Sequence, residues 1–206
     1  MQHAKVRPRI RSREYTEAMT LAVGGKPIDR PRVVALLRAS ARKGDGRSAY
    51  ALGNWHVHGI GVRKDNKKAA DLFLQAASAG VAEGAYGLAV CFETGKGRKR
   101  DHKQALQWYR RAAALGDVAA AAEVGRCLEF GIGAKVDLSR AVQWHRRAAK
   151  KGDADAQYSL GRAYRFGEVV PRSERWALHW YRKAAAGGSA EARAALDSMG
   201  EPAQQQ

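Results

Sequence analysis

The chain has 206 residues, 45% of them hydrophobic, and a formal net charge of +17 at pH 7. Charged residues interrupt every apolar stretch before it reaches the roughly 20 residues that a membrane-spanning helix needs, so we expect no membrane span. The positive charge attracts acidic proteins, nucleic acids and anionic lipid surfaces alike, and by itself it selects none of these partners.

The first part of the chain is basic and lacks a periodic apolar face. Residues 1–12 alternate basic side chains with small or apolar ones, and we predict a flexible basic arm there. The apolar segment that follows the basic start of a signal peptide is missing, because Glu14 and Glu17 interrupt it. We therefore expect a cytoplasmic protein.

A period of 36 residues dominates the rest of the chain. Residues 108–113 read WYRRAA, and similar residues recur at 144–149 (WHRRAA), at 180–185 (WYRKAA) and, more loosely, at 72–77 (LFLQAA). A strict period without insertions indicates one supersecondary unit that is stacked on itself as a solenoid. The four clear units are residues 49–84, 85–120, 121–156 and 157–192.

Each unit carries the pattern of two helices, which we call helix A and helix B in chain order. In helix A, a Leu or Val and the residue four positions later lie on one face, and a glycine is placed to end the helix. A second glycine follows in the loop, and an Asp is placed to cap helix B. The glycines that end helix A are Gly59, Gly95, Gly131 and Gly167, and the capping residues are Asp65, Asp101 and Asp137.

The fourth unit and the two ends of the chain depart from this pattern. Val169 stands in place of the second loop glycine and Ser173 in place of the capping Asp, so we expect a differently shaped loop there. Terminal repeats are expected to be atypical because each has only one neighbour. We predict a degenerate N-terminal capping repeat at residues 13–48, a C-terminal capping helix at 193–200 and a disordered tail at 201–206.

The repeated motifs resemble those of the Sel1-like repeat family, relatives of the tetratricopeptide repeat. Residues 156–161 (AQYSLG) fit A-x-Y-x-L-G, residues 59–65 (GIGVRKD) fit G-x-G-V-x-x-D, and residues 177–185 (ALHWYRKAA) fit A-x-x-W-Y-R-K-A-A. The resemblance covers about residues 29–200. It implies an all-α, right-handed superhelical solenoid of antiparallel helix pairs, with the A helices along the concave face.

The family also implies a function, that of a non-catalytic scaffold for protein–protein interaction in the bacterial cytoplasm. Its members include signalling regulators, assembly adaptors, host-interaction factors and immunity proteins, and the sequence does not select among these roles. The chain contains none of the common motifs for a catalytic nucleophile or a phosphate-binding loop. We therefore predict no enzymatic activity and no cofactor.

The histidines and cysteines do not indicate a metal site or a disulfide. His56 and His58 are two residues apart, so on a helix they point in very different directions and cannot share an ion. Cys91 and Cys127 occupy the same position in consecutive units, about one helix spacing apart, which is too far for a relaxed disulfide. We expect two free thiols in a reducing compartment.

The repeated tryptophans of helix B are predicted to lie in the hydrophobic core. Trp108, Trp144 and Trp180 recur at the position where the family has tryptophan, and we predict that they are buried packing residues.

The positions at which the repeats differ indicate a binding surface. On the first helix A, positions 51, 54, 55 and 58 form a stripe at helical spacing that is offset from the core stripe. If the A helices line the concave face, this stripe forms the floor of a groove. The candidate partner-binding residues are Asn54, Trp55, His58, Val90, Cys91, Arg126, Cys127, Phe130, Arg162 and Phe166.

Aromatic residues beside arginines have the composition of binding hot spots. We expect the partner to be a protein or peptide segment with an acidic residue and an apolar anchor, its carboxylate bound by Arg126 or Arg162. The alternative is that the aromatic residues pack between adjacent helices. We also expect the protein to be a monomer.

A different class of function follows from the charge alone. Non-specific binding of nucleic acid or an anionic surface needs no base-reading motif, and it would be weak and sensitive to salt. The candidate basic patch consists of Lys5, Arg7, Arg9, Arg11 and Arg13 in and next to the arm, and Lys96, Arg98, Lys99 and Arg100 in a loop.

Overall fold

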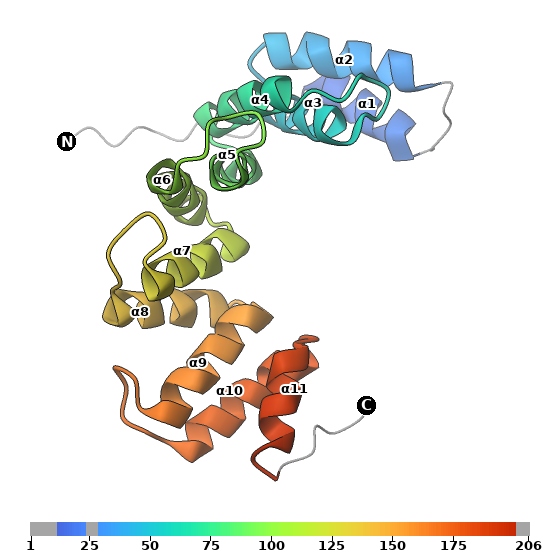
Figure 1. The fold of residues 1–206 in the computed structure, drawn as a ribbon. Coiled ribbons are helices and arrows are strands. Elements are labelled where there is room, and N and C mark those ends of the chain that lie inside the picture. The colour runs from blue at the N-terminus through green and yellow to red at the C-terminus, as the bar shows by residue number, and fades with distance from the viewer. Residues whose placement is uncertain (1–11, 24–28, 201–206) are drawn as a thin grey trace, which may run out of the picture.

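The computed structural model describes residues 12–23 and 29–200, which form eleven α-helices and no β-strand (Figure 1). The predicted all-α fold is confirmed. Most of the predicted arm and all of the predicted tail lie outside the described residues. The helices are α1 Arg13–Val23, α2 Arg30–Arg42, α3 Gly46–His58, α4 Asn66–Ser78, α5 Ala82–Thr94, α6 His102–Ala114, α7 Val118–Phe130, α8 Leu138–Ala149, α9 Ala154–Phe166, α10 Glu174–Ala186 and α11 Ala190–Asp197.

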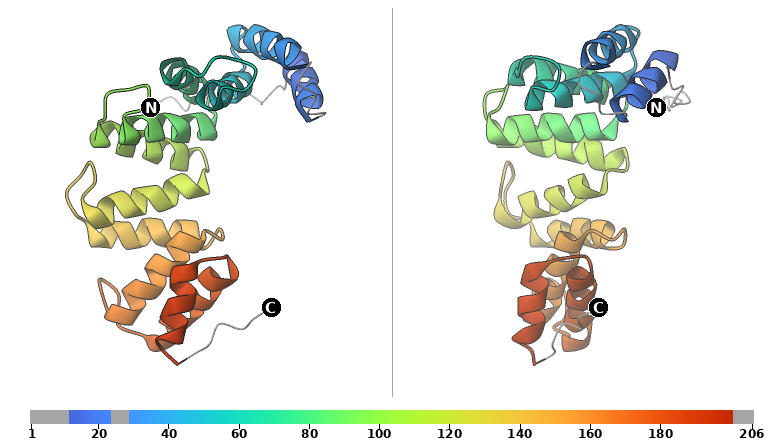
Figure 2. Two further views of the ribbon diagram at one scale, coloured as in Figure 1. Left: turned by 45° about the vertical axis from the view of Figure 1, so that its right-hand side comes forward. Right: turned by 90° about the vertical axis from the view of Figure 1, so that its right-hand side faces the viewer.

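The helices stack in chain order as a curved solenoid (Figure 2). The A helices of the four clear units are α3, α5, α7 and α9, and each is followed by its B helix, α4, α6, α8 or α10. Neighbouring A helices contact one another, α3 with α5 and α7 with α9, whereas the described B helices do not do so to the same extent. The A helices therefore lie on the inner, concave side of the curve.

The predicted helix ends and caps are present. Gly59, Gly95, Gly131 and Gly167 end the A helices with φ between 71° and 78°, a left-handed conformation that glycine adopts without a steric cost. At the start of the B helices, the side chains of Asp65, Asp101 and Asp137 each accept a hydrogen bond from the backbone N–H three residues later, and Ser173 does the same for α10.

The second loop glycine lets each loop approach the B helix of the preceding unit. A Cβ atom on Gly97 would lie 2.0 Å from the carbonyl oxygen of Asn66, and one on Gly133 would lie 2.1 Å from that of His102. Both glycines have a positive φ. Val169 occupies the same position in the fourth unit and has φ +64°. Among the described residues, every other residue with a positive φ is a glycine. A β-branched side chain is strained there.

The most deeply buried aromatic position is not the one that we predicted. The rings with the smallest exposed fraction, 1 to 5%, are those of Phe73, Tyr109, His145 and Tyr181. Trp180 is also buried, with 9% of its area exposed, whereas Trp108 and Trp144 are only partly buried. The reason is that the A helices carry a small residue opposite the most deeply buried ring: glycine in three of the four units, and Ala89 in the second unit, in the same buried cluster as Tyr109. A Cβ atom on Gly161 would lie 2.4 Å from Cδ1 of Tyr181, so only glycine permits the contact.

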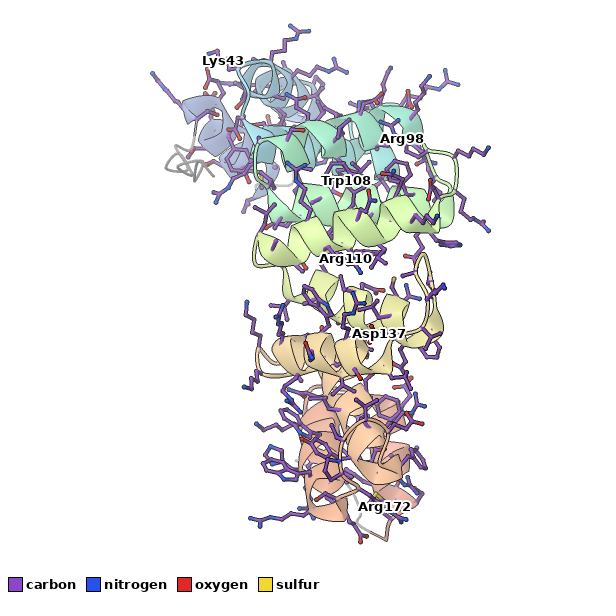
Figure 3. The ribbon with its side chains drawn as sticks, turned by 90° about the vertical axis from the view of Figure 1, so that its left-hand side faces the viewer. Lys43, Arg98, Trp108, Arg110, Asp137 and Arg172 are labelled. Atoms are coloured by element: carbon purple, nitrogen blue, oxygen red, sulfur yellow. The ribbon has the colours of Figure 1, made fainter. Side chains whose placement is uncertain are left out.

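The tryptophans pack across the outer side of the same interfaces. The guanidinium of Arg111 lies 5.2 Å from the ring centroid of Trp108, and that of Arg147 lies 4.7 Å from the ring of Trp144. Figure 3 shows Trp108 together with Arg110 on α6. The repeated basic residues thus cover tryptophan rings that remain partly open to solvent.

The N-terminal end of the solenoid is anchored by polar contacts. Ser12, which the sequence analysis assigned to the flexible arm, accepts a hydrogen bond from the N–H of Tyr15 and donates one to Asp45 at 2.9 Å. Asp45 in turn caps α3. Ser12 is thus tied to the residue that caps α3, and α1 and α2 form a helix pair that covers the first clear unit. At the other end, α11 packs on α10.

We predict that Val169→Gly stabilises the protein. A residue with a Cβ atom destabilises the folded state by about 1 to 2 kcal/mol when its backbone is left-handed, and glycine removes this strain. Glycine also gives the unfolded chain more conformational freedom, which offsets about half of that stabilisation. The melting temperature should rise by about 2 to 4 °C. Val170→Gly is the control, because Val170 has no positive φ, and it should lower the melting temperature. An unchanged or lower value for Val169→Gly would contradict the strain argument.

A second prediction concerns the buried ring. Tyr109→Ala should lower the free energy of unfolding by about 3 to 5 kcal/mol, because it leaves a cavity at a position that is 1% exposed. Trp108→Ala, the neighbouring residue on α6, should cost about half as much or less, since its ring is already partly solvated. Urea unfolding followed by circular dichroism measures both. If Trp108→Ala lowers the free energy of unfolding more than Tyr109→Ala does, Tyr109 is not the main buried ring of this unit.

Candidate functional site

The predicted groove residues divide into exposed and packed groups. Phe130 and Phe166, which end α7 and α9 at equivalent positions, are 61% and 60% exposed. Arg126 and Arg162 lie one turn earlier on the same helices and are partly exposed. His58 is exposed at the end of α3, and Asn54 is partly buried. The stripe is therefore open to a partner mainly in the third and fourth units.

The other stripe residues are core, which corrects our prediction for them. Cys91 and Cys127 are 6% and 1% exposed, and neither can contact a partner in this structure. Val90 packs against a buried cluster of α5, α6 and α7, and Trp55 packs against the cluster formed by α1, α2 and α3. The alternative, that aromatic residues of the stripe pack between helices, therefore holds for Trp55 but not for Phe130 or Phe166.

A cavity of about 260 Å³ opens beside the exposed phenylalanine of α7. Its walls come from the A helices α7 and α9, from α11 and from one residue of α8, so it lies on the inner side of the solenoid. The residues that line it are Ala122, Glu123, Arg126, Glu129, Phe130, His145, Asp155, Ala156, Tyr158, Ser159, Arg162 and Glu191.

A ladder of hydrogen bonds joins the buried rings to this surface. The hydroxyl of Tyr109 donates to Glu93 at 2.6 Å, and Glu93 also binds Arg126 of the next unit. Arg126 donates a further hydrogen bond to Glu123 at 2.6 Å. The two arginines of the predicted groove are thus placed by contacts within the protein.

The next unit repeats the arrangement with a different ring. Nε2 of His145 donates to Glu129 at 3.1 Å, and Glu129 binds Arg162 at 3.2 Å. Glu93 and Glu129 are 36 residues apart, as are Arg126 and Arg162. Each rung therefore links a B-helix ring, a carboxylate of its own A helix and an arginine of the following A helix.

The ladder changes the charge that a partner would meet. The cavity is lined by four carboxylates, those of Glu123, Glu129, Asp155 and Glu191, against the two arginines, which leaves two carboxylates in excess apart from His145. Both arginines already bind carboxylates. The expected role of Arg126 and Arg162, to bind an acidic residue of the partner, would require these internal ion pairs to break, and the local charge opposes it.

The contacts also shift the acidity of the ladder groups. Burial alone would raise the pKa of Glu93, but the hydrogen bonds from Tyr109 and Arg126 outweigh it and hold that pKa below its ordinary value. The hydrogen bond from His145 is the main reason that the pKa of Glu129 is lowered as well. Both carboxylates are therefore ionised at neutral pH.

The two thiols have the opposite character. Burial raises the pKa of Cys91, and it raises the pKa of Cys127 to about 11. Both cysteines are free. Because the thiolate is the reactive form, neither residue is suited to nucleophilic or redox chemistry at neutral pH.

The predicted basic patch is only partly assembled among the described residues. Lys5, Arg7, Arg9 and Arg11 lie outside them, and Arg13 is the first residue of α1. Lys96, Lys99 and Arg100 are exposed on the loop between α5 and α6. Arg98, labelled in Figure 3, is different. It forms an ion pair with Asp71 at 2.7 Å, and its side chain is 22% exposed.

Residues 12–23 and 29–200 contain no group of three or more His, Cys, Asp or Glu side chains that could hold a metal ion. In the same residues, no helix combines the length and the hydropathy needed to cross a membrane.

The carboxylates of this site were not predicted from the sequence. Within the repeats, acidic residues were assigned only as caps of helix B, and none is among the candidate groove residues. The signal was present, because a Glu and an Arg separated by 33 residues occur twice, as Glu93 with Arg126 and Glu129 with Arg162. In a solenoid with a period of 36 residues, that separation places the two side chains on adjacent A helices.

Comparisons with known proteins agree on one family. The family model described as Sel1 repeat matches residues 46–81, 82–117, 118–153 and 154–189. These units start three residues before the boundaries that the sequence pattern suggested. A search of curated proteins finds no match.

Solved structures give the same answer. A Sel1 repeat protein from Oxalobacter formigenes superimposes with a TM-score of 0.83 at 34% identity, over 90% of this chain and 76% of that one. A protective antigen from uropathogenic Escherichia coli strains, which displays an SLR fold, gives 0.78 at 34% identity, over 81% of this chain and 36% of that one. An immunity protein from Pseudomonas aeruginosa shares the fold, with a TM-score of 0.55 at 23% identity over 90% and 70% of the two chains.

The ladder predicts a specific pH dependence. The pKa of Glu93 in the folded protein lies below its ordinary value of 4.5, so its contribution to stability is complete above that pH and is lost as the pH falls through the folded pKa. Glu93→Gln should lower the free energy of unfolding by about 1 kcal/mol at pH 7. The difference from wild type should shrink as the pH falls below about 4.5 and through the lower folded pKa.

Glu83→Gln is the matched control, because Glu83 is an exposed carboxylate on the same helix, α5. It should leave the unfolding free energy nearly unchanged at each pH. Urea unfolding at several pH values measures both variants. A pH profile for Glu93→Gln that runs parallel to wild type would show that the ladder does not stabilise the fold.

Proposed function

Because the chain belongs to the Sel1 repeat family, whose members are protein-interaction scaffolds, we propose that it holds a segment of a partner protein on the concave side of α7, α9 and α11. The observation that carries the proposal is the pair of exposed phenylalanines, Phe130 and Phe166, at equivalent ends of adjacent A helices, with Phe130 lining a cavity between these helices. Large aromatic side chains that are exposed and close to a cavity are typical of binding hot spots.

The charges of the cavity indicate the chemistry of the segment. Carboxylates are in excess there, with Asp155 and Glu191 exposed. A segment with an apolar anchor and a lysine or arginine therefore fits better than the acidic segment that the sequence suggested. The two basic side chains of the surface are occupied by Glu93, Glu123 and Glu129.

The proposal includes the remaining expectations about the protein. The family is generally non-catalytic, and we infer the same for this chain. Buried free thiols suit a reducing compartment, which supports a cytoplasmic location. A monomer leaves the concave surface open to the partner. A regulator and an immunity protein would both act in this way, by holding a segment of the protein that they control.

A second candidate function is non-specific binding of nucleic acid or of an anionic surface. It rests on the net charge of +17 and on the exposed Lys96, Lys99 and Arg100. Such binding depends on counterion release and falls steeply between about 50 and 200 mM salt. Affinity purification with and without nuclease separates the two functions, because a protein partner held in the groove is retained after nuclease treatment.

The groove proposal gives a prediction for the purified partner. Phe130→Ala and Phe166→Ala should each weaken binding by about 2 kcal/mol, which is about thirty-fold in Kd. Both side chains are about 60% exposed, so the melting temperature should stay within a few degrees of wild type. Isothermal titration calorimetry and thermal melting on the same preparations measure the two quantities.

Leu74→Ala is the control for loss of an exposed apolar side chain, because Leu74 is 39% exposed on the B helix α4. It should leave the Kd unchanged. If the phenylalanine variants bind the partner as well as wild type does, or if they lose affinity only because they unfold, the groove proposal is wrong.

A further inference from the structure

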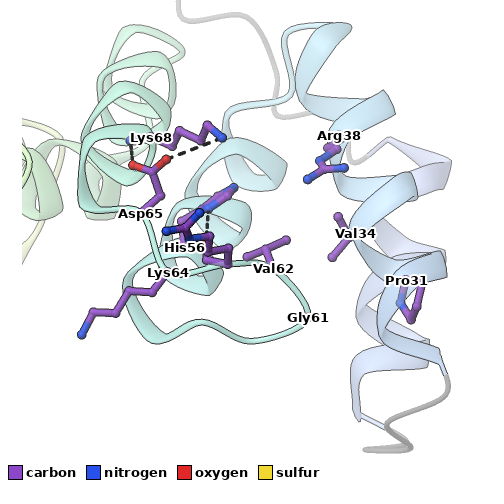
Figure 4. A pocket seen from close by; sticks show the side chains of 10 residues that line it. Pro31, Val34, Arg38, His56, Gly61, Val62, Lys64, Asp65 and Lys68 are labelled. Carbon is purple, nitrogen blue, oxygen red and sulfur yellow. Dashed lines mark hydrogen bonds and ion pairs between the residues drawn. The ribbon is translucent and has the colours of Figure 1, made fainter.

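We call the contact between the loop of one unit and the B helix of the preceding unit a junction. The first junction, between the loop after α3 and α2, lacks the backbone contact that closes the next two. Gly97 and Gly133 bring their loops against the backbone of α4 and α6, with 2.0 and 2.1 Å between a Cβ placed on each glycine and a carbonyl oxygen. The equivalent Gly61 meets only side-chain atoms, with Cβ of Arg30 nearest at 3.1 Å. The loop between α3 and α4 therefore meets α2 through side chains at the first residue of that helix and not through the backbone, and a pocket of about 580 Å³ lies between the loop and α2 (Figure 4).

Cationic side chains from three elements line this pocket. Arg38 comes from α2, Arg63 from the loop and Lys68 from α4. Figure 4 shows Arg38 and Lys68 pointing toward one another across the opening. Asp65 is the one carboxylate of the lining, and it is engaged in capping α4 and in an ion pair with Lys68 at 3.5 Å. Arg38 and Arg63 form no ion pair with the described residues.

A buried histidine adds a hydrogen-bonding group of a different kind. His56 is 6% exposed and lines the pocket. Its Nδ1 lies 3.1 Å from the carbonyl oxygen of Arg63, and a carbonyl oxygen can only accept, so Nδ1 carries the proton. Nε2 makes no hydrogen bond with a described residue, and in the neutral ring it is an acceptor. The pocket thus combines cations with one buried acceptor.

We propose that this pocket binds a phosphate group. The oxygens of a phosphate dianion can accept hydrogen bonds from Arg38 and Arg63, whose guanidinium groups suit this geometry, while Lys68 stays paired with Asp65. A monohydrogen phosphate also carries one O–H, which can donate to Nε2 of His56. The site is separate from the concave groove, so the proposal stands or fails independently of the proposed function.

The chain offers a matched control for charge. Arg110 and Lys135 stand 72 residues after Arg38 and Arg63, at the same positions of a junction that Gly133 closes. The variants Arg38→Ala/Arg63→Ala and Arg110→Ala/Lys135→Ala each lose two positive charges. Any effect of the overall charge should be the same in both, whereas an effect of the pocket should appear only in the first.

The experiment is a calorimetric titration of the full chain with inorganic phosphate at pH 7.5 and constant ionic strength, with thermal melting to verify that each variant is folded. Arg38→Ala/Arg63→Ala should weaken phosphate binding at least tenfold, and the control should stay within about twofold of wild type. Equal losses in the two variants, or wild-type protein that does not bind phosphate, would overturn the proposal.

Two further ligands sharpen the assignment. Sulfate has the same shape and charge but no proton at this pH, so it should bind at least tenfold more weakly than phosphate, and equal affinity would overturn the phosphate site. O-phosphoserine tests the same proton, because at pH 7.5 its phosphate ester is mostly a dianion without an O–H. It should therefore bind as weakly as sulfate, and affinity equal to that of inorganic phosphate would overturn the hydrogen bond to His56.

Discussion

The contact between a small residue of helix A, glycine in three units and alanine in one, and a helix B ring fixes the geometry of the whole solenoid. Gly125 packs on His145 and Gly161 on Tyr181, in each case so closely that any side chain on the glycine would overlap the ring. Close packing of this kind leaves one relative position for the two helices. A small residue occupies this position in all four units, with Ala89 in place of glycine in the second, so the contact stacks the A helices side by side and forms the continuous concave surface.

The buried rings also determine the charge of that surface. Tyr109 and His145 each place a donor at the end of a buried ring, and each donor reaches a carboxylate of helix A. That carboxylate, once ionised, binds the arginine of the next unit. At the last unit the carboxylate is replaced by Arg165, which donates to Ser198 of the C-terminal end, so the acid-to-arginine ladder stops there. Core and groove are therefore one hydrogen-bonded system.

The sequence predicted the helices, their caps and the repeat period well, because these depend on local chemistry that recurs at fixed spacing. It failed on which side of helix A each residue faces. One position of helix A is occupied in the four units by Trp55, Cys91, Cys127 and Ala163. The two cysteines and Ala163 are buried against neighbouring helices, and Trp55 is half-buried. Helical periodicity gives the angle of a residue about its own helix, but not the side from which the next unit approaches. That side is set by the contact between the small residue of helix A and the ring of helix B.

The net charge is a poor guide to this protein because a solenoid sorts its charges along its length. Each unit contacts only its neighbours, so a cationic pocket and an acidic cavity can coexist without cancelling. The open junction near Arg38 and Arg63 presents cations at one end, whereas the cavity beside Phe130 presents an excess of carboxylates nearer the other. Exposed charges are screened over about 8 to 10 Å at physiological salt, which is about the spacing of adjacent packed helices. A partner at either place therefore meets the local side chains and not the charge of the whole chain.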